Sequence, residues 1–240
     1  PGKFYGMDSI VEFLIIIVSI IISYSSYRIY KIIKEKNYKF FSWAFFLIAV
    51  SYFFKILSNL TIFHKFEIEN SNFILTVVSQ LEYMSIINFI SFILYKSFQI
   101  MGFLILFLII TRTINKEKIF LFIYLTFIAV LFSIYFNFVF YITVFFILLF
   151  LTIHFYENYG KIKSKNTLIV FSAFCIMLIS HAFFIFSDMH SFFYLTGETL
   201  LLIGFLSLLI NQIQIKNSNS KKKFLKKNLK KSRINQKTQR

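Results

Sequence analysis

The stretch YRIYKIIKEKNYKFFSWAFFLIAVS, residues Tyr27–Ser51, returns in altered form as YENYGKIKSKNTLIVFSAFCIMLIS, residues Tyr156–Ser180. Nine positions are identical at a constant spacing of 129, and they include the polar pattern Tyr-x-x-Tyr-x-x-Ile-Lys-x-Lys-Asn. The alternative is a chance match between two apolar runs of low complexity, but chance matching would not be expected to preserve polar residues. The pair therefore predicts an internal duplication.

The composition is that of a membrane protein. Of 240 residues, 58% are hydrophobic and only 15% are charged, whereas soluble proteins are nearer ~45–50% apolar and ~25% charged. Apolar runs of about 20 residues recur along the chain, which is the length that a helix needs to cross ~30 Å of hydrocarbon. We therefore predict an all-α, multi-pass protein of the cell membrane.

The hydropathy pattern predicts seven transmembrane helices. Their approximate ranges are 10–31, 40–62, 86–111, 119–136, 138–156, 168–187 and 192–214. Residues 73–111 could instead hold two helices broken near Lys96, and residues 73–84 could lie in the outer interface or extend the third helix. With seven spans and the N-terminus outside, the basic clusters 28–39, 112–118 and 161–165 and the basic C-terminus all fall on the inner side, as the positive-inside rule requires.

The duplication divides these seven spans into two parallel three-helix repeats. Residues Phe92–Leu104 align with Tyr194–Leu206, here at a spacing of 102, so the first copy carries 27 extra residues in the outer connection before its third helix. The transmembrane domain is thus predicted over residues 1–215, with repeat 1 at about 10–111, an inverting linker helix at 119–136 and repeat 2 at about 138–214. Residues 216–240 form a basic cytoplasmic tail.

A 3+1+3 arrangement of this kind resembles that of the SWEET-type sugar transporters and of the microbial rhodopsins. The resemblance implies a binding site between the halves, near the bilayer midplane. The Pro-Gln pair of SWEET-type relatives is absent, because the only proline is Pro1, and residues 192–214 contain no lysine that could bind retinal. The helix with Gly-Glu and Gly-Phe-Leu at 197–206 is similar to uncharacterised archaeal seven-helix membrane proteins, a likeness that implies no particular activity.

Four ionisable residues inside predicted spans stand out as candidates, all in the outer half of the bundle: Lys55, Lys96, His181 and Glu198. Such groups cost roughly +2.5 to +3.5 kcal/mol each on insertion scales, so they usually face a partner or a cavity. The functional interpretation is a polar pocket in which Glu198 and His181 exchange a proton or bind a cationic group, because histidine titrates near neutral pH. The structural interpretation is a fixed Glu198–Lys96 ion pair with His181 hydrogen-bonded nearby, and Lys55 extended to the interface.

Gln99 and Asn88, on the same predicted helix as Lys96, would line this pocket or hydrogen-bond to one another. No catalytic residue, metal site or cofactor is expected. His154 lies at a different depth from His181, so the two are unsuited to a bis-histidine haem. No His, Cys or acidic cluster has zinc spacing, and no phosphate-binding loop or nucleophile elbow is present.

The basic tail holds ten Lys or Arg residues and no acid between Lys221 and Arg240. It would lie on anionic lipid head groups, at about 1 kcal/mol for each cation near the surface, bind an acidic partner, or remain solvated and enforce topology. The residues expected to make such surface contacts are Lys221, Lys222, Lys223, Lys226, Lys227, Lys230, Lys231 and Arg233.

Taken together, these features favour a non-enzymatic integral membrane protein that senses or binds a small ligand in the outer half of the bundle and recruits partners at its inner face. A small-solute or proton-coupled transporter using Lys96, His181 and Glu198 is the first alternative. A structural membrane subunit without a ligand is the second. A dry bundle with these charges paired would favour the structural alternative.

Overall fold

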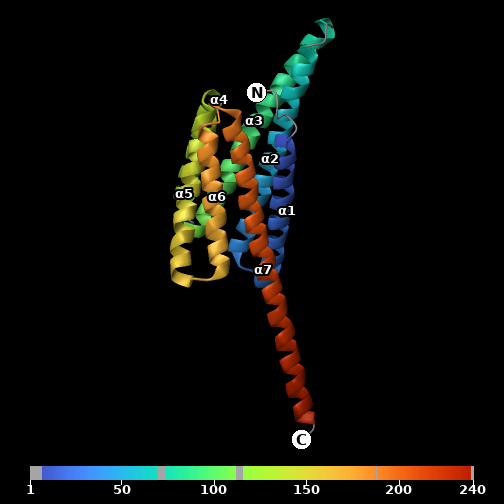
Figure 1. Cartoon of the computed structure of the whole chain (residues 1–240), viewed down its shortest axis with the longest axis vertical. Coiled ribbons are helices and arrows are strands. Elements are labelled where there is room, and N and C mark those ends of the chain that lie inside the picture. The colour runs from blue at the N-terminus through green and yellow to red at the C-terminus, as the bar shows by residue number, and fades with distance from the viewer. Residues whose placement is uncertain (1–6, 70–73, 112–115, 188, 239–240) are drawn as a thin grey trace.

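A computed structural model of the chain shows a bundle of long helices (Figure 1). It describes the backbone of residues 7–69, 74–111, 116–187 and 189–238, and the side chains of residues 8–60, 85–111, 120–121, 123–187, 189–190 and 192–215. Within these residues there are seven helices: α1 (Met7–Ile33), α2 (Lys36–Glu69), α3 (Ile74–Thr111), α4 (Lys116–Tyr135), α5 (Asn137–Ile162), α6 (Lys165–Ile185) and α7 (Ser191–Thr238).

Six of the described helices are long and apolar enough to span a membrane, as predicted. These are α1, α2, α3, α5, α6 and α7, each with an apolar segment of 21 to 27 residues. The fourth predicted span corresponds to α4, whose described apolar segment, Ile123–Tyr135, is shorter. The chain is therefore a multi-pass helical membrane protein.

The helices pack as two groups of three. In one group α2 lies between α1 and α3, and in the other α6 lies between α5 and α7. The groups meet where α1 contacts α7 and where α3 contacts α5, and α4 packs beside α3 and α5. In Figure 1, α1 and α7 both run downward, from the end of the bundle marked N toward the end marked C. These ends are called the upper and lower ends below.

The two stretches that opened the sequence comparison adopt the same turn. Helix α1 is followed by Lys34 with φ 59°, and helix α5 by Lys163 with φ 48°, both in the left-handed region. In each case the backbone N–H donates to a tyrosine carbonyl four residues earlier, Tyr30 at 2.7 Å and Tyr159 at 2.8 Å. Such a left-handed residue ends a helix by satisfying one of its last carbonyls.

Two glycines of α3 and α7 allow similarly close helix contacts. A Cβ atom added at Gly102 would lie 2.6 Å from Ile48 Cγ1 and 3.0 Å from the carbonyl oxygen of Ala44. One added at Gly204 would lie 2.7 Å from Met177 Cγ and 3.2 Å from the carbonyl oxygen of Ala173. Close approach at small residues is the usual way in which membrane helices pack.

Two predicted boundaries need correction. The second predicted span, 40–62, ends too early, because α2 continues as far as Glu69. Of the two alternatives left open for residues 73–84, the described residues 74–84 extend α3. The α2–α3 pair consequently projects beyond the upper end of the bundle (Figure 1). At the lower end α7 does not stop near residue 214, because its backbone helix continues through the basic segment to Thr238.

Candidate functional site

Three described helices bring one buried cation and two buried carboxylates together near the upper end of the bundle. Lys55 Nζ, on α2, lies 3.1 Å from Glu12 Oε1 of α1 and donates a hydrogen bond to Glu198 Oε1 of α7. Lys55 is 6% exposed, and Glu12 and Glu198 are 0% exposed. We call Glu12, Lys55 and Glu198 the charged cluster.

Aromatic rings surround the ammonium group of the charged cluster. The ring centroids of Tyr194, Tyr52, Tyr95 and Phe184 lie 5.1, 5.4, 5.6 and 5.8 Å from Lys55 Nζ. A cation within about 6 Å of an aromatic face is attracted by the ring quadrupole, and more strongly where water is excluded. The rings come from α2, α3, α6 and α7, so they favour a charged Lys55 at the point where both helix groups meet.

The two carboxylates of the charged cluster are satisfied unequally. Asn59 Nδ2 donates to Glu12 Oε1 at 3.0 Å and to Oε2 at 3.1 Å, and Tyr194 Oη donates to Glu12 Oε1 at 3.4 Å. Glu198 Oε2, in contrast, is buried without a hydrogen-bond partner among the described residues. The side chain of Glu198 is therefore the less satisfied of the two.

Further titratable groups act on the charged cluster from the neighbouring helices. They are Asp8 on α1, Tyr52 on α2, Tyr95 on α3, His181 on α6 and Tyr194 on α7, and Tyr141 on α5 acts in turn on the three tyrosines. Asp8 precedes Glu12 by about one helical turn, and its Oδ1 atom is buried without a partner within the described part of the chain. Among the described residues, the surroundings thus add one carboxyl group, several phenol groups and one imidazole to the charged cluster.

The predicted ion pair between Glu198 and Lys96 is wrong, because Glu198 pairs with Lys55. Lys96 Nζ instead donates to the carbonyl oxygen of Ser133 at 2.8 Å and to Asn137 Oδ1 at 2.9 Å, and it lies 3.6 Å from the ring centroid of Phe92. Lys96 belongs to the interface of α3 with α4 and α5, whereas Glu198 belongs to the interface of α7 with α1 and α2. The alternative in which Lys55 extends to the interface is also wrong, since Lys55 is buried.

The remaining predicted residues do not form hydrogen bonds to the carboxylates of the charged cluster among the described residues. His181 is 0% exposed, its Nδ1 lies 3.0 Å from the carbonyl oxygen of Met177, and its Nε2 has no partner among the described residues, so no hydrogen bond joins it to Glu198. Gln99 Nε2 donates to Tyr52 Oη at 3.5 Å, and Asn88 Oδ1 accepts from Ser58 Oγ. Gln99 and Asn88 therefore do not satisfy one another.

Glu12 is the member of the charged cluster that the sequence did not select. The available signal was the one used for the other residues, namely an ionisable side chain inside an apolar helix. Glu12 lies only five residues from the start of α1, where a carboxylate is ordinarily stabilised by the helix N-terminus and the interface. Its complete burial against Lys55 follows from tertiary packing.

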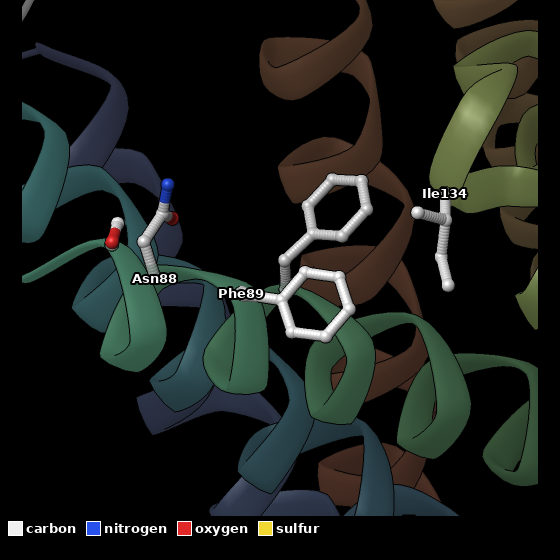
Figure 2. A pocket seen from close by; sticks show the side chains of 5 residues that line it. Asn88, Phe89 and Ile134 are labelled. Atoms are coloured by element: carbon white, nitrogen blue, oxygen red, sulfur yellow. The ribbon is translucent and has the colours of Figure 1, made fainter. Parts of the chain in front are cut away.

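A separate open pocket lies on α3 and α4, away from the charged cluster. It is lined by Ser85, Asn88, Phe89, Phe92 and Ile134. Figure 2 shows Phe89 and Ile134 on different helices at this pocket, with Asn88 at its polar edge. Phe89 is half exposed, so this pocket opens to the surface of the bundle, and none of its lining residues belongs to the charged cluster.

The predicted surface contacts of the basic tail lie outside the residues whose side chains the structure describes. They therefore stay a prediction for Lys221, Lys222, Lys223, Lys226, Lys227, Lys230, Lys231 and Arg233.

No family model, curated protein or solved structure matches the chain. What the charged cluster does is therefore argued from its own geometry.

Proposed function

We propose that the chain is a non-enzymatic membrane protein that binds a proton at the charged cluster and senses it through the contact between its two helix groups. The observation that carries this proposal is the excess of one carboxylate. Two buried glutamates share one lysine, and Glu198 Oε2 has no partner in the described part of the protein. One further positive charge would make the charged cluster neutral.

The membrane environment makes such neutralisation favourable. Removing an ion from water costs several kcal/mol even after the protein has relaxed around it. Lys55 offsets one of the two carboxylates, and the surrounding rings add to its attraction. A proton on Glu198 would remove the remaining charge and would convert Oε2 from an acceptor without a partner into a hydroxyl.

The position of the charged cluster connects proton binding with helix packing. Glu12 and Lys55 belong to the first group of helices and Glu198 to the second, so Lys55 holds the groups together. Protonation of Glu198 would weaken its attraction to Lys55 and would leave the Lys55–Glu12 pair intact. The expected response is then a change in the contact between α1 and α7. Because α7 continues from Glu198 to the basic tail, this change would be transmitted to the lower end of the bundle.

We propose in addition that the two groups of helices arose by duplication. The matching left-handed lysines, Lys34 and Lys163, and the matching glycines, Gly102 and Gly204, support this. Applying the two sequence spacings, Glu12, Lys55 and Glu198 correspond to Tyr141, Phe184 and Lys96. The rings of Tyr141 and Phe184 stack with centroids 5.3 Å apart, beside the α3–α5 contact that corresponds to the α7–α1 contact. We infer that an ancestral pair of equivalent interfaces diverged, one becoming charged and the other aromatic.

Infrared difference spectroscopy on the protein in lipid nanodiscs tests the proposal. When the pH is lowered from neutral to mildly acidic values, the wild type should gain the carbonyl band of a protonated carboxylic acid, because the charged cluster holds one carboxylate more than Lys55 offsets. Glu198→Gln should lose that band, whereas the matched variant Glu157→Gln, which removes an exposed glutamate of α5, should retain it. A wild type without any band that depends on Glu198 would contradict proton binding.

The structural alternative is favoured by a different observation, the pairing of Lys55 with both glutamates. A fixed ion pair would give no change in protonation across the same pH range. It would still make the charged cluster necessary for stability. The infrared experiment therefore separates a structural subunit from a proton-binding protein.

A further inference from the structure

Helix α1 carries a row of polar residues on one buried face below the charged cluster. Glu12, Ser19 and Ser26 follow one another at intervals of seven residues, and all three are at most 1% exposed. Seven residues are close to two helical turns, so these side chains lie on the same side of α1. Residues on the opposite side, such as Leu14 and Ile21, are exposed toward the surroundings of the bundle.

Helix α7 follows this row in register. Tyr194 Oη contacts Glu12 at the upper end, and Gln212 Nε2 donates to Ser26 Oγ at 2.9 Å at the lower end. From the first contact to the second, the residue numbers increase in both helices. Helices α1 and α7 therefore run parallel, as Figure 1 also shows. The distance from Glu12 to Ser26 along α1 is ~21 Å at 1.5 Å per residue, which is most of a ~30 Å hydrocarbon core.

Atoms along this row have unused hydrogen-bonding capacity. Ser19 Oγ, Glu198 Oε2 and Gln212 Oε1 are all buried without a partner among the described residues. Ser19 is 0% exposed and lies, by its spacing, between the upper and lower contacts with α7. Buried polar groups of this kind ordinarily bind ordered water, so their positions indicate where water would enter the α1–α7 interface.

An apolar layer separates the upper and lower polar groups. Ile15 and Ile22 of α1 and Phe205 of α7 are 0% exposed. The ring of Phe205 packs edge-on against Phe45 and Tyr52, with centroids 6.1 and 6.5 Å apart. At the level of this apolar layer, α1 contributes one polar side chain, Ser19. The upper and lower polar groups are thus separated by an apolar layer that contains a single hydroxyl group of α1.

We propose that the α1–α7 interface is a proton pathway from the charged cluster to the Ser26–Gln212 pair, with Ser19 as the relay and Phe205 as the gate. The proposal rests on the proton-binding function proposed above. Glu198 takes up a proton and later releases it to water in the interface, and no other bond changes. A hydroxyl can accept and donate hydrogen bonds at once, which proton transfer along water requires.

Proteoliposomes with a pH-sensitive dye inside and a clamped membrane potential test the pathway. Ser19→Ala should reduce the proton flux of the wild type by about tenfold or more, as expected for the loss of one hydrogen-bonding relay group. Phe205→Ala should raise the flux several-fold by opening the apolar layer. Ser207→Ala is the matched control, because in the described part of the chain Ser207 Oγ bonds only to the carbonyl oxygen of Ile203 on its own helix. The flux of this variant should equal that of the wild type.

Misfolding would not explain a loss of flux in Ser19→Ala, since the variant removes a hydroxyl that has no partner among the described residues, and removing such a group should not destabilise the fold. Equal fluxes in the wild type, Ser19→Ala and Phe205→Ala, or no flux above protein-free liposomes, would overturn the pathway. If the infrared band of Glu198 is present without flux, the pathway alone is wrong. If band and flux are both absent, proton binding is wrong as well.

Discussion

Lys55 determines whether two carboxylates can remain inside the bundle. Its ammonium is the one cation of the charged cluster, and four aromatic rings surround it. A buried ion pair contributes little net stability against an apolar pair of the same size, but removal of one partner leaves a charge without compensation. The effect of a substitution here should therefore depend on which charges remain.

Lys55→Met is expected to destabilise the protein by about 3–5 kcal/mol, because it leaves Glu12 and Glu198 buried without a cation. Thermal unfolding in detergent micelles measures the change. The triple variant Lys55→Met, Glu12→Gln and Glu198→Gln should recover most of the lost stability, since Glu12, Lys55 and Glu198 are then all replaced by uncharged side chains. A triple variant as unstable as Lys55→Met would show that packing, and not charge, controls this site.

At the scale of helices, the two groups of three are built by similar local devices. A left-handed lysine ends α1 and α5, and a glycine lets α3 approach α2 and α7 approach α6. The two glycine contacts differ in the neighbour that would have to move. At Gly102 it is a β-branched isoleucine backed by a main-chain carbonyl, whereas at Gly204 it is a methionine, whose flexible side chain adapts more readily.

Gly102→Ala is therefore expected to lower stability by about 1–3 kcal/mol through overpacking, and Gly204→Ala to lower it by less. Gly160→Ala is the control, because an added Cβ there meets nothing within 4 Å, and alanine favours a helix over glycine by about 1 kcal/mol. The comparison uses thermal unfolding of the three variants under the same conditions. Equal losses at all three sites would contradict the close contact at Gly102.

At the scale of the whole molecule, the charged cluster lies at one end of the bundle and the basic extension of α7 at the other (Figure 1). The predicted orientation places the charged cluster toward the outside and the basic tail inside. A sensor would then face external protons and report to the interior. This relation depends on an orientation that sequence charge alone predicts.

Cysteine labelling of intact cells tests the orientation, starting from Cys175→Ala, which removes the only native cysteine. A cysteine introduced by Met189→Cys, at the exposed upper turn between α6 and α7, should react with a membrane-impermeant maleimide. One introduced by Gly160→Cys, at the lower end of α5, should react only after the cells are permeabilised. The reverse pattern would place the charged cluster inside.

The helical class, the positions of the six long apolar helices and the presence of ionisable residues inside those helices follow from patterns within single segments. Apolar length determines where a helix can span a membrane, and an ionisable residue in such a segment must find a partner. The pattern also allowed residues 73–84 to extend α3, as the described residues 74–84 do. It did not show that α2 and α7 extend beyond their predicted spans, because both extensions contain several charged residues.

The identity of the partners was decided by tertiary structure. Lys55 and Lys96 lie at similar predicted depths, and sequence has no means of telling which of two such lysines faces Glu198. The distinction depends on how the helices are rotated and which of them touch: α7 packs against α1, and α3 packs against α5. Sequence therefore determined that charges are buried in this membrane protein, and only the packing of three distant helices decided that Glu12, Lys55 and Glu198 share one site.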